Sequence, residues 1–399
     1  MTRHSDETIG ERIARRRKVL GLSIRQVADR AGINASTLSR IERGLRSADN
    51  RFMLADIAGA LRCSAADLTG QPTIPTDRGA AEVSGNVHET VRAGIEVDLR
   101  YESDGQPPDL LALDRELTLV RDLRVRADIV GATQRLPALL RGLHAAAFGP
   151  QRVDALRGLV LAADTGSFVV RYGGDPQGAC ILAERAQQAA EVLEDPVFLA
   201  LGSWSRAHAA TGCGLYGRAY QIAERAADSL EHSTGLPDAL ELLGQLYLTQ
   251  AFALMAAGDP EGAAVRVAAA EEIAERTGDS PALRLCFGPT NNRLWRISME
   301  VDGGDPGRAV EIARDTKVVV LESTSRQAAF YLDTGRALAA CRKDAEALRM
   351  LLAAERIAPQ RLRLSPFAAE TVRALLERSQ RSAAGAQLRG LCSRMGIVL

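Results

Sequence analysis

Polar side chains that could recognise the edge of a nucleobase lie close together in the segment INASTLSRIERG, residues 33–44. Ser36 and Thr37 carry hydroxyl groups that both donate and accept hydrogen bonds, and the Thr37 methyl could contact a thymine methyl. Arg40 follows Ser36 by about one helical turn and could donate two hydrogen bonds to guanine. Ala35 is short and offers fewer direct contacts. The alternative for Arg40 is an ordinary solvated surface arginine.

Apolar spacing predicts the helices that would position these side chains. Ser23 can cap a second helix, Gly32 permits a left-handed turn, and Asn34 can cap a third helix that ends at Arg43. A fourth helix at about 50–62 and a short fifth helix from Ser64 follow. The inward positions of the first three helices are Ile13, Leu20, Val27, Ala28, Ala31, Leu38 and Ile41. Two short helices joined through a glycine predict a helix-turn-helix.

Helix N-termini and arginines near the third helix are predicted to contact the DNA backbone. The N-termini of helices attract phosphate, which suits Ser23 and Asn34. Arg43 and Arg46 flank the third helix and are predicted phosphate partners, and Arg25 is a weaker candidate.

The formal net charge of zero hides an uneven distribution. The first 70 residues hold 13 Lys and Arg against 8 Asp and Glu, a net charge of +5, so the remaining residues carry −5. The basic part coincides with the predicted helix-turn-helix, where attraction to phosphate is needed. Neutrality of the whole chain therefore does not exclude a nucleic-acid partner.

The rest of the chain is expected to be helical and repetitive. Aromatic residues make up only 4% of the sequence, while Ala and Leu, which favour helices, are abundant. Segments that begin at Gly174, Gly214, Gly258, Gly304 and Arg342 share an alanine at their sixth position and follow a longer apolar helix. Each pair predicts a helical hairpin in which the small alanine lets two helices approach closely. Domains are predicted at 1–70 and 88–399, joined by a linker at 71–87.

The segment LSIRQVADRAGINASTLSRIERG resembles the XRE family of bacterial and phage repressors. The residues that carry the resemblance are Leu22, Ala28, Gly32, Ser39, Ile41, Glu42 and Gly44. It implies an N-terminal five-helix, lambda-repressor-like domain that binds double-stranded promoter DNA as a homodimer. It also implies base-reading roles for Ala35, Ser36 and Arg40, and a structural salt bridge between Arg17 and Glu42.

The hairpins resemble the tetratricopeptide class, in which helical hairpins stack into a superhelix. Their alternative is ordinary helical-bundle packing. The combination of the two parts is similar in architecture to the peptide-pheromone receptors of Gram-positive bacteria, which implies an effector bound by the repeats. The expected fold is therefore all-α throughout.

Polar and aromatic side chains in the repeats are candidates for binding such an effector. Phe287, Asn291 and Trp295 recur at every fourth residue, with Asn292 beside them, and Tyr247 and Gln250 share a face of the preceding long helix. The alternative is that the aromatic residues belong to the core and that Asn292 is solvated.

Other classes of protein find little support in the sequence. It contains no GxxxxGK[ST], HExxH or GxSxG motif, so an enzyme is not expected, and neither is a cofactor. The six cysteines are scattered without a CxxC pair, which predicts no metal site and favours buried thiols in the cytoplasm. No run of eighteen apolar residues is present, so a membrane span is not expected.

The sequence therefore favours a sequence-specific transcriptional regulator whose repeats dimerise and sense a peptide, a small molecule or a protein. The alternative is a protein-interaction scaffold or antitoxin-like partner in which DNA binding is secondary.

Overall fold

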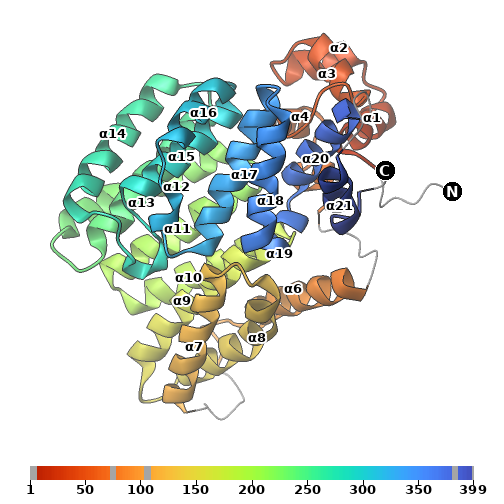
Figure 1. Ribbon diagram of the computed structural model, residues 1–399. Helices are drawn as coiled ribbons and strands as arrows, with labels where there is room; N and C mark the ends of the chain where they lie inside the picture. Colours follow the sequence, from red (N-terminus) through yellow and green to blue (C-terminus); the bar gives the residue numbers. More distant parts are fainter. Residues whose placement is uncertain (1–6, 72–77, 103–108, 380–384, 398–399) are drawn as a thin grey trace. The chain divides into compact units, whose positions relative to one another are not determined.

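The computed structural model of the protein describes residues 7–71, 78–102, 109–379 and 385–397 (Figure 1). Within these ranges the chain forms α-helices α1 to α21 and three short 3-10 segments, η1 to η3. The described part contains no β-strand, and its single antiparallel bridge joins Ser280 and Phe287. The all-α prediction is confirmed.

Five short helices form the N-terminal segment. They are α1 (Ile9–Val19), α2 (Ile24–Arg30), α3 (Ala35–Glu42), α4 (Arg51–Ala60) and α5 (Ala65–Thr69). Reciprocal hydrogen bonds cap three of them, at Thr8, Ser23 and Ser64, and each satisfies backbone donors that a helix start leaves open. Their apolar faces meet in one core that includes Ile13, Val27, Leu38, Ile41, Leu54 and Ile57.

Five helical hairpins follow, each a long helix, a tight turn and a second helix. The paired helices are α9 (Arg152–Tyr172) and α10 (Pro176–Leu193), α11 (Pro196–Gly212) and α12 (Tyr216–Leu230), α13 (Ala239–Ala256) and α14 (Pro260–Thr277), α15 (Pro289–Gly303) and α16 (Pro306–Arg314), and α17 (Thr324–Ala340) and α18 (Asp344–Ile357).

The hairpin turns use the same local chemistry. Gly174, Gly258 and Gly304 have φ of +99°, +78° and +97°, a conformation that favours glycine. In each of these turns the next residue is an aspartate whose carboxylate accepts a hydrogen bond from the third residue of the second helix. The shared alanines are at most 3% exposed; they are Ala179, Ala219, Ala263, Ala309 and Ala347.

Helix α6 (Arg78–Glu96) occupies part of the segment expected to be a linker. Its Val83, Val87 and Val91 form an apolar stripe that packs against Val170 and Ala179. Burial of this stripe outweighs the glycine and serine that weaken the helix in the sequence. Residues 72–77 lie outside the described ranges, and the predicted domain boundaries stay a prediction.

Contacts group the chain into two compact units. Unit 1 comprises Met1–Thr76, Arg296–Thr316 and Gln327–Leu399, and unit 2 comprises Asp77–Trp295 and Lys317–Arg326. Unit 1 therefore contains the N-terminal helices together with α19 (Pro359–Arg363), α20 (Pro366–Ser379) and α21 (Ala386–Arg394). Unit 2 begins with α6, α7 (Leu110–Val125) and α8 (Ile129–Ala146). Three of its loops contain η1 (Glu231–Ser233), η2 (Ala282–Arg284) and η3 (Val318–Val320).

Helix α13 is, among the described helices, the one long and apolar enough to cross a membrane by length and composition, with a mean hydropathy of 1.2. Two thirds of this stretch, 67%, is buried inside the protein, as is usual for the core helix of a globular domain.

Candidate nucleic-acid interface

The turn between α2 and α3 has the geometry that the glycine in the sequence predicts. Gly32 has a φ of +64°, and the backbone N–H of Ile33 donates to the Ala28 carbonyl at 3.0 Å. Ser23 caps α2, because its Oγ accepts from the Gln26 N–H at 3.2 Å while the Gln26 side chain accepts from the Ser23 N–H. Both ends of α2 are therefore held by local hydrogen bonds.

Helix α3 has an inner and an outer face. Leu38 and Ile41 are 0% and 1% exposed and belong to the core. Ala35, Ser36 and Arg40 are exposed. The outer face therefore offers a hydroxyl and a guanidinium one turn apart to a partner in solvent.

Thr37 lies at the edge of that outer face. It is half-buried, and its Oγ1 accepts a hydrogen bond from Arg46 Nη1 at 3.3 Å. The Thr37 hydroxyl is therefore positioned by Arg46, an arginine that was predicted to bind phosphate.

Asn34 occupies the N-cap position of α3, but its side chain makes no capping hydrogen bond. The sequence predicted such a bond. Its absence leaves the first N–H groups of α3 without a side-chain acceptor, and Asn34 itself is exposed. A phosphate oxygen could take that place, because helix N-termini favour negative charge.

The three arginines predicted to contact phosphate, Arg25, Arg43 and Arg46, are exposed. Arg43 Nε donates to the Ser39 carbonyl at 3.2 Å, which keeps its side chain along α3. The Arg25 side chain is 87% exposed and 3.9 Å from Asp29, and a surface pair of this kind contributes little stability. These guanidiniums therefore remain accessible to a polyanion.

A partly buried salt bridge fixes the end of α3. Arg17 of α1 donates to both carboxylate oxygens of Glu42, at 2.6 and 2.7 Å, and to the Leu22 carbonyl at 2.9 Å. The side chains are 12% and 7% exposed, and the hydrogen bond to Glu42 raises the pKa of Arg17. This is the pair that the family resemblance implied. It neutralises a carboxylate that would otherwise repel phosphate, and it connects α1, the α1–α2 loop and α3.

Gly10 allows α1 to reach α3 closely, which the sequence did not indicate. A Cβ at this position would lie 2.2 Å from the Ile41 carbonyl oxygen. The close backbone approach places Arg17 of the same helix within reach of Glu42. The sequence shows this close approach only as a glycine inside a predicted helix, and such glycines are too common to be informative in a single sequence.

A second group of charges holds α4 within unit 1. Arg51 Nε is 2.5 Å from Asp302 Oδ2, and Arg336 Nη2 is 2.6 Å from the other oxygen of the same carboxylate. Both arginines also donate to Asp333, at 3.0 and 2.8 Å. Burial raises the pKa of Asp333, but the charges of Arg51 and Arg336 outweigh it and lower that pKa to about 2.

This buried network joins residues more than 200 positions apart, so sequence reasoning missed it. It ties α4, the helix that follows α3, to α15 and α17. The orientation of the helix-turn-helix within unit 1 is therefore determined by charged contacts as well as by its own core.

An open groove in unit 1 lies next to the outer face of α3. Arg40 and Arg46 lie on one wall, and residues of α17 and α20 line the other. Glu377 of α20 lies beside Gly44. Its carboxylate places a negative charge near the end of α3, where it opposes phosphate.

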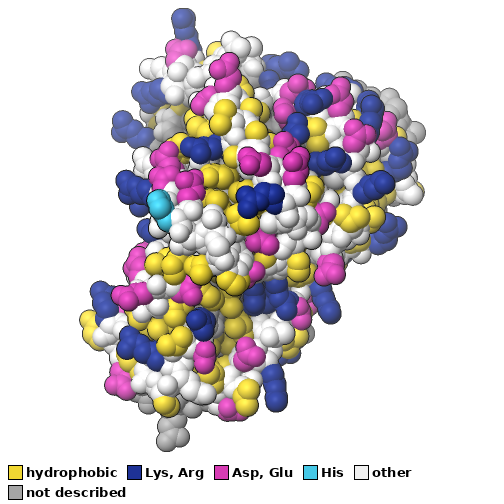
Figure 2. All heavy atoms as spheres, turned by 90° about the vertical axis from the view of Figure 1, so that its left-hand side faces the viewer, with side chains coloured by type: hydrophobic (Ala, Val, Ile, Leu, Met, Phe, Trp, Pro, Cys, Tyr) yellow, Lys and Arg dark blue, Asp and Glu magenta, His cyan; other side chains and the backbone are white. Residues whose placement is uncertain are grey.

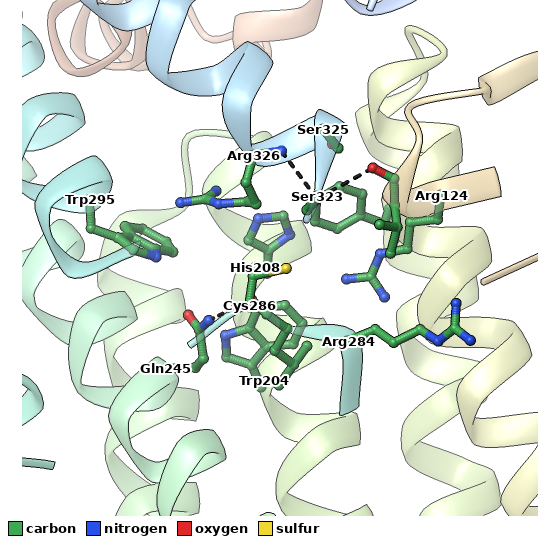
Figure 3. Close-up of a pocket in the computed structure, with 13 residues that line it drawn as sticks. Arg124, Trp204, His208, Gln245, Arg284, Cys286, Trp295, Ser323, Ser325 and Arg326 are labelled. Carbon is green, nitrogen blue, oxygen red and sulfur yellow. Dashed lines mark hydrogen bonds between the residues drawn. The ribbon is translucent and has the colours of Figure 1, made fainter. Parts of the chain in front are cut away.

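The six residues predicted to bind an effector mostly lie in the core of unit 2. Phe287 is 0% exposed and packs on Gly244, and Gln250 is 1% exposed and donates to the Ala223 carbonyl. The half-buried Tyr247 donates to Glu231 at 2.5 Å. The remaining residues are Asn291, Asn292 and Trp295, at 0%, 1% and 9% exposure. Phe287 and Trp295 are buried, as the alternative of a core role predicted, whereas Asn292 is buried and not solvated. Of these six residues, Trp295 also lines a cavity of unit 2 (Figure 3).

Figure 2 shows one face of the molecule, on which basic and acidic side chains are interspersed and separated by small hydrophobic areas. Within the described ranges, no three His, Cys, Asp or Glu residues lie close enough together to hold a metal ion.

Comparison with known proteins agrees with the geometry of the N-terminal helices. Residues 8–69 match the family described as helix-turn-helix domain. The match covers α1 to α5 and ends before α6. A search of curated proteins gives no match to the chain. The N-terminal segment is therefore a helix-turn-helix domain, which suggests a DNA-binding regulator.

Proposed function

We propose that the protein is a cytoplasmic, sequence-specific transcriptional regulator, and that its helical hairpins form a tetratricopeptide-like region that dimerises and senses an effector. The proposal assigns no catalytic reaction to the chain. The observation that carries it is the arrangement of α3, where Ser36 and Arg40 are exposed while Leu38 and Ile41 are buried. A helix with this arrangement fits the major groove and presents its polar face to base edges.

The roles of individual residues follow from their positions. Ala35, Ser36, Thr37 and Arg40 would read bases, and Arg40 would contribute most because it can bind guanine through two hydrogen bonds. Ser23, Arg25, Asn34, Arg43 and Arg46 would contact phosphate. These contacts position the domain without selecting sequence.

A dimer is part of the proposal because one helix-turn-helix offers few contacts. Two copies would read half-sites about one helical turn apart. Sedimentation analysis of the full chain tests this, and a monomer both free and on its DNA site would contradict it.

The central experiment is the selection of binding sites from random DNA, followed by titration of the selected site with Arg40→Ala and Arg30→Ala. Arg30 is an exposed arginine at the end of α2 and serves as the control. We expect Arg40→Ala to weaken binding by about tenfold to a hundredfold and to relax preference at one base pair. Unchanged affinity and preference would reject α3 as the reading helix.

A further inference from the structure

Two cysteines that are 33 residues apart in the sequence lie next to each other in unit 2. The Sγ atoms of Cys180 on α10 and Cys213 at the end of α11 are 3.6 Å apart, and they lie 3.5 and 3.3 Å from the same carbonyl oxygen, that of Pro176. The sulfur atoms of a disulfide are about 2.05 Å apart. The two sulfurs would therefore have to approach by only about 1.5 Å, which rotation of the two side chains can supply.

Packing between two helices holds this pair in place. Helix α10 ends the first hairpin and α11 begins the second, so the two sulfurs lie on either side of the boundary between neighbouring hairpins. The backbones of these helices come close at Gly202 of α11, because a Cβ there would lie 2.9 Å from Gln187 Cα of α10. Ser203 Oγ also donates to Gln187 Oε1 at 3.0 Å. The approach of the two sulfurs therefore depends on the packing of two long helices and not on a loop.

Local hydrogen bonds fix the start of α10 and the end of α11. Asp175 caps α10 by accepting from the Gly178 N–H at 2.8 Å, and Cys180 follows in the second helical turn. The backbone N–H of Cys213 donates to the Ala209 carbonyl at 3.3 Å and so continues the hydrogen bonding of α11. Both cysteines therefore belong to regular backbone, and neither helix has to unfold for the sulfurs to meet.

The charges around the pair favour ionisation of one sulfur. Arg171 of α9 lies beside the end of α11, where its Nη1 donates to the His208 carbonyl at 2.9 Å. The hydrogen bond from Cys213 lowers the pKa of Cys180, and the charge of Arg171 acts in the same direction, whereas burial and the charge of Asp175 oppose them. The same hydrogen bond and burial raise the pKa of Cys213. Cys180 is therefore the more acidic thiol, and Cys213 is the one that keeps its proton.

Both side chains are partly exposed, so a small oxidant can reach them. Thiolate character and exposure make a cysteine reactive, and a second thiol beside an oxidised sulfur leads to a disulfide. We propose that Cys180 and Cys213 form a peroxide-sensitive pair, in which Cys180 is oxidised first and Cys213 then closes a disulfide that joins the two hairpins. This chemistry goes beyond the proposed function and is independent of DNA binding.

The oxidation takes place in two steps with hydrogen peroxide as the oxidant. The Cys180 thiolate attacks the peroxide, an S–O bond forms, the O–O bond breaks, and hydroxide leaves and is protonated to water. The Cys213 sulfur then loses its proton and attacks the Cys180 sulfur, the S–S bond forms, and the S–O bond breaks with release of a second water. The two cysteines lose two electrons, which hydrogen peroxide accepts.

Mass spectrometry of the full chain after treatment with hydrogen peroxide and alkylation of the remaining thiols tests for the disulfide. We expect a linked pair of peptides containing Cys180 and Cys213, which dithiothreitol separates. The link should be absent in Cys213→Ser and retained in the control Cys341→Ser, which replaces another partly exposed cysteine. Recovery of both cysteines as separate alkylated thiols, under conditions that oxidise free cysteine in the same tube, would overturn the proposal.

The order of the two steps is tested with dimedone, which reacts with sulfenic acids and not with thiols. In Cys213→Ser the serine keeps a hydrogen-bond donor beside Cys180, and peroxide should produce a sulfenic acid on Cys180 that dimedone labels. In Cys180→Ser we expect little or no label on Cys213, because its thiol keeps its proton. Labelling of Cys213 that is as fast as labelling of Cys180 would overturn the assignment of Cys180 as the residue oxidised first.

A comparison of the folded and the unfolded chain tests whether the fold selects this pair. In native buffer the link between Cys180 and Cys213 should be the main disulfide. In concentrated urea a mixture of links among the six cysteines should form instead. The same mixture in both conditions would mean that helix packing does not bring the two sulfurs together, and it would overturn the proposal.

Discussion

Polar residues of α3 and of α15 lie in opposite environments. Ser36 and Arg40 on α3 are exposed, whereas Asn291 and Asn292 on α15 are almost completely buried. The difference lies in the number of neighbours around each helix. A helix of a small domain has one core to face, so its polar side meets solvent, whereas a helix within stacked hairpins is covered on several sides.

The largest effect on stability is expected at a buried residue of unit 2. Phe287→Ala should lower the free energy of unfolding of unit 2 by about 3–5 kcal/mol, because Phe287 is fully buried against Gly244. Urea unfolding followed by tryptophan fluorescence measures it, since both tryptophans are in unit 2. The control is Phe148→Ala, at a ring that is 37% exposed and should lose about 1 kcal/mol or less. Similar losses for the two variants would show that Phe287 is not in a packed core.

Buried polar groups that are paired should behave differently from those that are not. The pKa of Asp333 is lowered to about 2 in the folded protein, so its ion pairs stabilise unit 1 above the ordinary carboxyl pKa. That stability is lost as the pH falls from about 4 to about 2, by about 2 kcal/mol. Hydrogen exchange of the α4 amides across this range measures the effect.

In Asp333→Asn the acid-dependent part of that protection should disappear, while exchange becomes faster at neutral pH. The exposed Asp29→Asn should leave the profile as it is. An unchanged acid profile for Asp333→Asn would mean that the ion pairs do not hold α4.

A smaller change in the stability of unit 2 is expected when the unpaired amide of Asn292 is replaced. Neither its oxygen nor its nitrogen has a hydrogen-bond partner among the described residues, so Asn292→Leu should leave unit 2 equally stable or stabilise it by about 1 kcal/mol. Thr249→Val is the control, because the fully buried Thr249 Oγ1 donates to the Gln245 backbone carbonyl at 2.9 Å, and it should destabilise by about 1 kcal/mol. The same fluorescence-monitored unfolding gives both values. A clear loss in Asn292→Leu would reveal a partner such as a bound water.

The smallest effect is expected at an exposed residue, Arg46, and concerns DNA binding. Arg46→Gln should weaken DNA binding a few-fold for every sequence and reduce the slope of log affinity against log salt by about 0.9, the value for one phosphate contact. Arg30→Gln should keep the slope of the unmodified protein. A change of sequence preference in Arg46→Gln would instead place that side chain, or the Thr37 that it holds, against a base.

Local sequence rules predicted the helix-turn-helix well. The apolar spacing of Leu38 and Ile41, the cap at Ser23 and the turn at Gly32 all act within a few residues, so the printed sequence contains the whole signal. The same holds for the hairpin turns, where glycine, aspartate and proline each have a local conformational role. Local rules did not predict that helix α6 begins at Arg78, within the segment expected to be a linker. This helix depends on the packing of its valines against residues that are distant in the sequence.

The cavity of unit 2 could not be predicted in this way. Periodicity correctly showed that Phe287 and Trp295 lie on related faces, but it does not reveal which faces neighbouring helices cover. Trp204, His208 and Arg124 come from other helices and line the same cavity as Trp295 only because those helices pack together. Each of them is unremarkable in the sequence.

The sequence by itself determined the helical type of the elements, the turn before α3, the exposed face of α3 and the alanines between paired helices. These depend on interactions within a few residues or on a repeated pattern. Tertiary structure alone decided the buried Arg51–Asp302–Arg336 network, the cavity with both tryptophans and the approach of Cys180 to Cys213. Such contacts join residues that are far apart in the chain, and their partners are selected by packing of whole helices rather than by local conformational preference.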